Sequence, residues 1–285
     1  MAESSDPTSE SPSGGAPGAS PAHHDGGLHI PVPGLDATVG AFRDQLANVE
    51  HLLRLPGRAL NEVEDRLVPA WRRRTTGEPR WAVSCAVAMA IALQLTLPHS
   101  LEMPPRWLLP AVGAALLCGI LIANPRRVDR RSRSLRATSV LLIGVLSLAN
   151  AVSAGRLINA LMRGRATQDA TLLLQWGGAI WLTNVLVFAL WYWELDRGGP
   201  AARAHADRQY PDLLFTQMAM PAIAPPDWEP QFLDYFYLAF TNATAFSPTD
   251  VLPMTRWAKM LMLLQSAVSV STVVLVVARA VNILK

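Results

Sequence analysis

The chain has 285 residues, of which 51% are hydrophobic and 16% are charged, and its formal net charge is +3. From Trp81 onward the apolar runs are long enough to cross a bilayer, which takes about 20 residues of helix, so an integral membrane protein is favoured over a soluble one. The two cysteines, Cys85 and Cys118, both lie inside apolar runs, so neither a disulfide framework nor a zinc site is predicted. Lysine is rare among the basic residues, a bias that suggests a bacterial source.

Two segments precede the first apolar run. Residues 1–34 are rich in Ser, Pro, Gly and acidic residues and are predicted to be a disordered tail, because they cannot bury enough apolar surface to fold. Residues 35–80 carry apolar side chains at helical spacing and predict amphipathic helices on the cytoplasmic side. Their polar face is mixed rather than basic, which favours packing on protein over lying on lipid. These helices either fold against the membrane domain or bind a protein partner through residues 35–68.

Residues 81–285 are predicted to form an all-α membrane bundle of about five spanning helices and one re-entrant or interfacial half-helix. The expected spanning helices cover residues 81–97, 107–123, 137–161, 170–193 and 257–284, and the half-helix covers residues 231–246. The run Trp191, Tyr192 and Trp193 is typical of an interfacial aromatic belt, and Glu194 and Asp196 after it are expected in water.

The link between the second and third helices predicts the orientation of the bundle. Its six arginines are opposed by one acidic residue, and the positive-inside rule places such a loop in the cytoplasm. The arginines are Arg126, Arg127, Arg130, Arg131, Arg133 and Arg136. The N-terminus is then also cytoplasmic, which predicts a multi-pass protein of the bacterial cytoplasmic membrane. Topology accounts for these charges, so no nucleic-acid partner is predicted, and counting helices returns residues 195–256 to the cytoplasmic side.

Polar residues inside the apolar runs are candidates for a pathway or for helix packing, because polar groups in hydrocarbon are unfavourable unless they face protein or water. In the last helix, Gln265, Ser269 and Thr272 lie close to one face and either line a wet pathway or bind neighbouring helices. The third helix has small residues at four-residue spacing, which predict a helix-packing seam. The residues of this seam are Ser147, Asn150, Ala151 and Gly155.

Residues 231–257 resemble the pore region of two-helix potassium channels, which consists of a half-helix, a Thr-rich filter, an Asp and a Pro before the exit helix. The matching positions are Thr241, Thr244, Asp250 and Pro253. Residues 245–249 depart from that pattern, because they include no glycine and Pro248 fixes φ and removes an N–H. The resemblance therefore implies the outline of a pore loop without a potassium-type filter. The simpler interpretation is a turn in which hydroxyls and Asp250 satisfy backbone groups.

Residues 81–285 also resemble an uncharacterised family of bacterial multispanning membrane proteins. Members of that family have four helices with a basic central loop, then an aromatic half-helix and a final helix. The residues that fit this outline are Asp234, Tyr235, Tyr237, Phe240, Phe246, Thr249, Asp250, Val281 and Asn282. This resemblance implies a membrane bundle and no particular function.

The sequence has no Gly-rich phosphate loop, no zinc-spaced His-Glu pair and no nucleophile with an evident base, so no enzyme activity, catalytic residue, cofactor or metal is predicted. The leading hypothesis is a homo-oligomeric, channel-like or transporter-like cation pathway in the lipid bilayer, because the C-terminal dipole of the half-helix and Asp250 favour a cation. Its candidate residues are Thr241, Thr244, Thr249, Asp250, Gln265, Ser269 and Thr272. The alternative is a non-conducting membrane scaffold that recruits a partner through residues 35–68.

Overall fold

The structure is a computed structural model that describes residues 68–284, except residues 103, 104, 106, 124–131 and 245–249, together with Gln45 alone. The predicted tail and almost all of the predicted partner segment lie outside the described residues. The other predicted residues that lie outside them are Arg126, Arg127, Arg130, Arg131, Phe246 and Thr249.

The described chain is mostly helical, as predicted. Its elements in chain order are η1 (Ala70–Arg72), α3 (Trp81–Leu95), α4 (Leu108–Ala123), α5 (Arg133–Met162), α6 (Ala170–Leu195), η2 (Asp196–Gly198), α7 (Pro200–Ala204), β1 (Leu213–Phe215), α8 (Thr216–Ala219), α9 (Phe232–Thr244), β2 (Val251–Pro253) and α10 (Arg256–Leu284). By length and composition, α5, α6 and α10 could each cross a bilayer, whereas α3 and α4 are apolar but have only 15 and 16 residues. Helices of that length reach about 23 Å, less than the roughly 30 Å of a bilayer core. Five spans therefore remain a prediction.

Residues next to α6 in the sequence explain where this helix begins and where the chain turns after it. At its start the carboxylate of Asp169 accepts hydrogen bonds from the backbone N–H groups of Thr171 (2.8 Å) and Leu172 (3.1 Å), which caps the helix. Beyond its end the chain turns at Gly199, whose φ of 99° suits glycine. A Cβ at this position would lie 2.9 Å from the carbonyl oxygen of Glu194, so a larger residue would force a shift.

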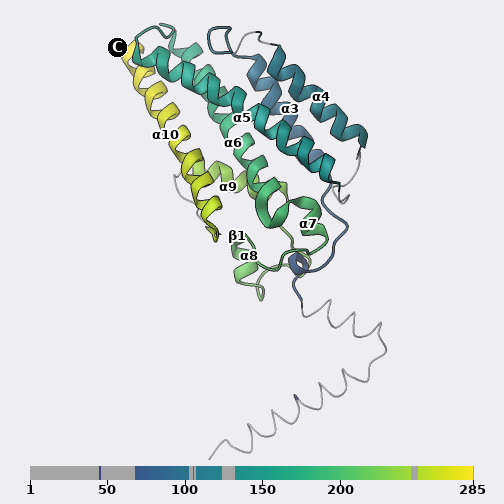
Figure 1. Ribbon diagram of the computed structural model, residues 1–285. Helices are drawn as coiled ribbons and strands as arrows, with labels where there is room; N and C mark the ends of the chain where they lie inside the picture. Colours follow the sequence, from purple (N-terminus) through teal and green to yellow (C-terminus); the bar gives the residue numbers. More distant parts are fainter. Residues whose placement is uncertain are drawn as a thin grey trace, which may run out of the picture. The chain divides into compact units, whose positions relative to one another are not determined.

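Helix α6 is central in the bundle: α3, α5, α9 and α10 pack against it, and α4 packs on α3 and α5 (Figure 1). Helices α6 and α10 approach closely at Gly177, where a Cβ would lie 2.7 Å from the side chain of Val276. A Cβ at the neighbouring Gly178 would meet nothing within 4 Å. Position 177 thus sets how closely the two long helices pack.

Helices α3, α5, α9 and α10 begin, and α4 and α6 end, at one end of the bundle, which we call the loop end. The guanidinium of Arg80 donates to the carbonyl oxygen of Ile120 (3.1 Å), which joins the start of α3 to the end of α4. Arg136 Nε lies 3.8 Å from Glu194 Oε1, which joins the start of α5 to the end of α6. The side of a membrane that this end faces stays a prediction, with the cytoplasm favoured by the arginine count.

A two-stranded antiparallel sheet at the loop end departs from the predicted all-α fold. The register is Leu213↔Pro253, Leu214↔Leu252 and Phe215↔Val251. The sheet joins the loop that follows α6 to the segment that precedes α10. It therefore holds the chain on both sides of α9 at the same end of the bundle.

The predicted aromatic belt and its solvated acids need correction. Four residues at the end of α6 are buried, with exposed fractions of 3% or less: Tyr192, Trp193, Glu194 and Asp196. The reason is that the chain after α6 folds back over the end of this helix instead of leaving it in water. Buried carboxyl groups need polar partners. The returning loop supplies backbone N–H donors to Asp196, whereas Glu194 lies 3.8 Å from the guanidinium of Arg136 at the start of α5.

The four residues of the predicted packing seam of α5 differ in burial within the single chain. Ala151 and Gly155 are exposed, and a Cβ at Gly155 would meet nothing within 4 Å, so these two positions do not bring helices together within the chain. Asn150 is buried, and the half-buried Ser147 accepts a hydrogen bond from the indole of Trp191 (2.9 Å). Within the chain, the buried face of α5 is thus turned away from Ala151 and Gly155, and a seam between copies stays a prediction.

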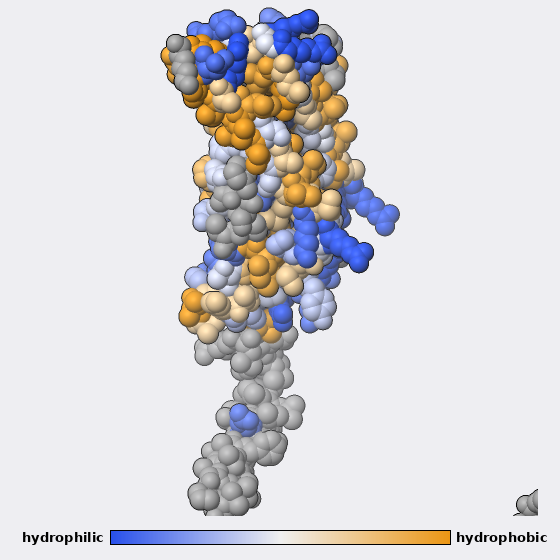
Figure 2. All heavy atoms as spheres, turned by 90° about the vertical axis from the view of Figure 1, so that its left-hand side faces the viewer, coloured by the Kyte–Doolittle hydropathy of each residue, from blue (hydrophilic) through white to orange (hydrophobic). Residues whose placement is uncertain are grey.

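The outer surface of the helices is largely apolar. Figure 2 shows hydrophobic residues over the upper part of this surface, between hydrophilic residues at the top and a mixed surface lower down. Large exposed side chains on α10 are Met260, Leu263, Leu264, Val274, Val277 and Val281. Soluble monomers rarely expose so many neighbouring apolar side chains.

Candidate functional site

Helix α9 enters the bundle from the loop end and stops inside it. The ring of Phe232, in its first turn, lies 6.4 Å from the ring of Trp193 at the end of α6. The last turn of α9 lies beside the middle of α10, where the hydroxyl of Ser269 donates to the carbonyl oxygen of Ala243 (3.1 Å). The next described residues, from Asp250 onward, lead into β2 at the loop end. The chain therefore enters and leaves the bundle at the same end.

Gln265 of α10 links three helices through one fully buried side chain. Its amide oxygen accepts hydrogen bonds from the hydroxyl of Tyr192 in α6 (2.7 Å) and from the amide of Asn242 in α9 (2.8 Å). Its amide nitrogen donates to the carbonyl oxygen of Ala239 in α9 (2.7 Å). This set of contacts fixes the depth at which α9 lies.

Two asparagines extend the link. The amide of Asn242 also donates to the carbonyl oxygen of Met262 (3.0 Å), and the amide of Asn184 donates to the carbonyl oxygen of Gln265 (3.3 Å). No side-chain atom of Asn184, Asn242 or Gln265 is buried without a partner. We call these three residues with Tyr192 the amide network.

The predicted polar stripe of the last helix is buried against neighbouring helices. Gln265, Ser269 and Thr272 have exposed fractions of 2% or less. Ser269 bonds to α9, whereas the hydroxyl of Thr272 donates to the carbonyl oxygen of Val268 in its own helix (2.8 Å). Within one chain these contacts favour the packing interpretation, and a part for the stripe in an ion pathway stays a prediction.

The pore-loop candidates are not brought together around one point by described contacts. The hydroxyls of Thr241 and Thr244 donate to carbonyl oxygens one turn earlier in α9, at 3.0 and 2.9 Å. Asp250 is exposed, and its backbone carbonyl accepts a hydrogen bond from the hydroxyl of Thr216 (2.8 Å). This bond anchors the backbone of Asp250 beside the sheet and leaves its carboxylate at the surface.

Asp196 is the centre of a buried cluster at the loop end. Its Oδ1 accepts hydrogen bonds from the backbone N–H groups of Asp212 (3.1 Å) and Leu213 (3.2 Å). Its Oδ2 accepts a hydrogen bond from the hydroxyl of Tyr235 in α9 (2.7 Å). One fully buried carboxylate thus ties the end of α6 to β1 and to α9.

Arg197 completes this cluster. Its φ of 53° is uncommon for a residue other than glycine, and its side chain is buried. The guanidinium donates to the carbonyl oxygens of Trp71 (2.6 Å) and Arg208 (2.9 Å), and the backbone N–H donates to the carboxylate of Asp212 (2.9 Å). The same carboxylate accepts from the indole of Trp257 (3.1 Å), so the cluster also fixes the start of α10.

Glu78 holds the start of α9. One carboxylate oxygen accepts a hydrogen bond from the backbone N–H of Phe232, and the other accepts from the indole of Trp193 (2.7 Å). A carboxylate at the start of a helix is also stabilised by the helix dipole. Burial raises the pKa of the Glu78 carboxyl above its ordinary value, although these hydrogen bonds and Arg203 lower it in part.

Sequence reasoning missed Glu78, Asp196, Arg197 and Asp212 as structural anchors. Glu78 and its partner Phe232 are 154 positions apart, and no spacing rule connects such residues. The one signal in the sequence was a pair of acidic residues, Glu194 and Asp196, directly after an apolar helix. Acidic residues in that place suit either water or a buried cluster, and the choice depends on where the later loop goes.

Among the described residues, no group of three or more His, Cys, Asp and Glu side chains could hold a metal ion. No protein-family model, no curated protein and no solved structure matches the chain. The resemblances to potassium-channel pores and to bacterial multispanning proteins stay predictions.

Proposed function

We propose that this chain is an integral membrane protein in which α6, α9 and α10 form a pore-loop unit for a cation. The observation that carries the proposal is the path of α9, which starts at the loop end, stops midway along α10 and is followed by a strand back at the loop end. With 13 residues, α9 is about 20 Å long, too short to cross a bilayer core of roughly 30 Å. A half-helix of this length places its C-terminus near the middle of the membrane.

The lengths of the three long helices and their exposed apolar side chains support a location in the membrane. The helices α5, α6 and α10 have 30, 26 and 29 residues and an apolar composition. The exposed side chains of α10 include Leu263 (61%) and Val274 (56%), which hydrocarbon accommodates better than water does. A bilayer would cover this surface.

The charge at the inner end of α9 supports a cation. The last carbonyl groups of a helix have no partners within that helix, and the macrodipole gives this end a partial negative charge. In the membrane, non-helical backbone is tolerated only where protein encloses it or water reaches it. Transporters use C-terminal ends of half-helices in this way to bind cations. The carboxylate of Asp250, six positions after the end of α9 at Thr244, adds negative charge to the return segment.

The amide network limits where a pathway can run. Gln265 and Ser269 fill the interface between α9 and α10, so ions do not pass between these two helices at that depth. The opposite side of α9, with Tyr237 and Phe240, is exposed in the single chain. We therefore place the pathway between copies of a homo-oligomer, with its entrance at the loop end on the cytoplasmic side.

The test is cation flux through purified protein in liposomes. Replacing Asp250 with Asn removes one negative charge from each return segment and should lower K⁺ or Na⁺ flux severalfold at unchanged protein content. Asp227→Asn is the matched control, because Asp227 is an exposed carboxylate in the loop before α9. The proposal fails if wild-type protein conducts neither ion above empty liposomes, or if the two variants conduct equally.

A further inference from the structure

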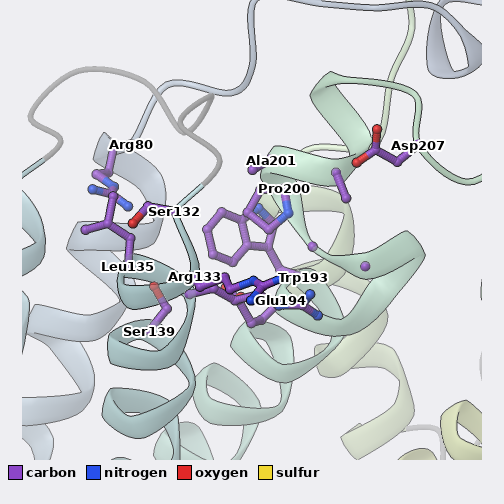
Figure 3. A pocket seen from close by; sticks show the side chains of 14 residues that line it. Arg80, Ser132, Arg133, Leu135, Ser139, Trp193, Glu194, Pro200, Ala201 and Asp207 are labelled. Carbon is purple, nitrogen blue, oxygen red and sulfur yellow. Dashed lines mark ion pairs between the residues drawn. The ribbon is translucent and has the colours of Figure 1, made fainter.

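A cavity of about 420 Å³ lies at the loop end among the starts of α3 and α5, the end of α6 and helix α7. Figure 3 shows its walls: Arg80, Ser132 and Leu135 stand on one side, Pro200, Ala201 and Asp207 on the other, and Trp193 and Glu194 between them. The cavity therefore combines apolar walls with several charged groups.

The groups that line the cavity carry one more positive charge than negative charges. Three guanidinium groups line it, those of Arg80, Arg133 and Arg136, against the carboxylates of Glu194 and Asp207. Glu194 lies 3.8 Å from Arg136, so the pair orients this guanidinium without removing the excess of positive charge. Arg80 is buried, and its bond to the carbonyl oxygen of Ile120 fixes it in place.

The start of α5 adds a second source of positive potential. This helix has 30 residues, its first turn has no acidic residue, and Ser132 at its N-cap makes no side-chain capping bond. The macrodipole therefore favours an anion here and disfavours cations. Yet Arg133 and Arg136 both lie in this first stretch of the helix and both line the cavity. One bound anion would compensate for the unfavourable placement of both arginines at the positive end of the helix dipole.

We propose that this cavity binds the phosphate group of an anionic ligand, which is either the headgroup of an anionic phospholipid or a soluble phosphate ester. Guanidinium groups bind phosphate oxygens through paired hydrogen bonds, and basic pockets between membrane helices bind lipid headgroups by this chemistry. The apolar walls at Leu135 and Trp193 suit the carbon atoms next to the phosphate. Trp193 also donates to Glu78, which holds the start of α9, so the side chains of Trp193 and Glu78 connect a bound headgroup to the half-helix.

Binding is measured by calorimetry on the full chain in a neutral detergent. The probes are phosphatidylglycerol, phosphatidylcholine of the same chain length and glycerol 3-phosphate. We expect saturable binding of phosphatidylglycerol and none of phosphatidylcholine. Binding of glycerol 3-phosphate with similar affinity identifies a soluble phosphate ester as the ligand, and its absence identifies the lipid.

The double variant Arg133→Gln/Arg136→Gln should weaken this binding at least tenfold, because it removes two charged hydrogen-bond donors. The double variant Arg163→Gln/Arg165→Gln is the control, because it removes the same charge from exposed positions just beyond the other end of α5. Without ligand, the unfolding temperature of the first variant should change little, since the loss of two charges that oppose the helix dipole offsets the loss of the contact between Arg136 and Glu194.

The variant Glu194→Gln tests the same site through the opposite effect, an increase in affinity. It keeps the shape of the buried side chain and removes a negative charge from the cavity, so phosphatidylglycerol or glycerol 3-phosphate should bind severalfold more tightly. The proposal is overturned if the wild type binds none of the phosphate probes, or if both double arginine variants weaken binding equally.

Discussion

Two of the buried interfaces between helices differ in how fully the hydrogen-bonding groups of their polar side chains are satisfied. In the amide network between α6, α9 and α10, both amide atoms of Gln265 have partners in other helices. Between α3 and α5, the hydroxyl of Ser153 reaches the amide oxygen of Gln94 only at 3.4 Å. The amide nitrogen of Gln94 and the amide oxygen of Asn150 are buried without a partner.

This difference indicates which part of the bundle is specified by polar contacts. A buried polar group with partners fixes one arrangement, whereas one without a partner lowers stability by about 1–3 kcal/mol. The position of α9 is therefore set by directional bonds. The packing of α3 on α5 depends on shape and apolar contact, with Gln94 and Asn150 as weak points.

The largest expected effect comes from Gln265→Leu. This change removes three hydrogen bonds: it leaves the buried hydroxyl of Tyr192 without its acceptor, takes one of two acceptors from the amide of Asn242, and removes the side-chain donor to the carbonyl of Ala239. The free energy of unfolding in detergent should fall by about 3 kcal/mol, since each of the three lost hydrogen bonds contributes about 1 kcal/mol. A loss below about 1 kcal/mol would show that the amide network does not hold α9.

A smaller loss is expected from Gly177→Ala. The new Cβ would lie 2.7 Å from Val276, so α6 and α10 must separate or Val276 must shift, at a cost of about 1–3 kcal/mol. Gly178→Ala is the matched control, because a Cβ there meets nothing within 4 Å. Adding Val276→Ala should restore part of the stability; equal unfolding temperatures for the two single alanine variants would contradict the close approach.

A change of pH should separate Glu78 from the other anchors of α9. Because burial raises its folded pKa, its contribution to stability is fully present below the unfolded pKa of about 4.3 and is lost as the pH rises through the folded pKa. The unfolding temperature of the wild type should therefore fall more steeply than that of Glu78→Gln as the pH is raised from about 4.5 toward neutral. Asp227→Asn serves as the control, because Asp227 is an exposed carboxylate in the loop before α9. Parallel curves for wild type and Glu78→Gln would show that the raised pKa of Glu78 makes no contribution to the pH dependence of stability.

The smallest effect is expected from Asn150→Leu. The amide oxygen of Asn150 is already buried without a partner, so replacing the side chain by an apolar one of similar volume removes an unfavourable group. Stability should change by less than about 1 kcal/mol or rise, in contrast to Gln265→Leu. A loss as large as that of Gln265→Leu would remove the distinction between the two interfaces.

The sequence alone was sufficient to predict the three long helices and the half-helix, because the signal for each of them is local. Apolar runs of bilayer length predict α5, α6 and α10 to within a few residues, and the aromatic run with Asp234 predicts a half-helix close to the observed α9. The polar stripe was also visible, since Gln265 and Ser269 lie one turn apart on the same helix. What these side chains contact was left open between water and protein.

Only the tertiary structure decided those contacts, because their partners are far apart in the sequence. Gln265 meets Tyr192 across 73 positions and Glu78 meets Phe232 across 154, and periodicity holds no information on such pairs. For the same reason Glu194 and Asp196, at the end of α6, were expected in water although the returning chain buries them. Composition determines that a helix forms; the path of the chain determines which of its polar groups find a partner.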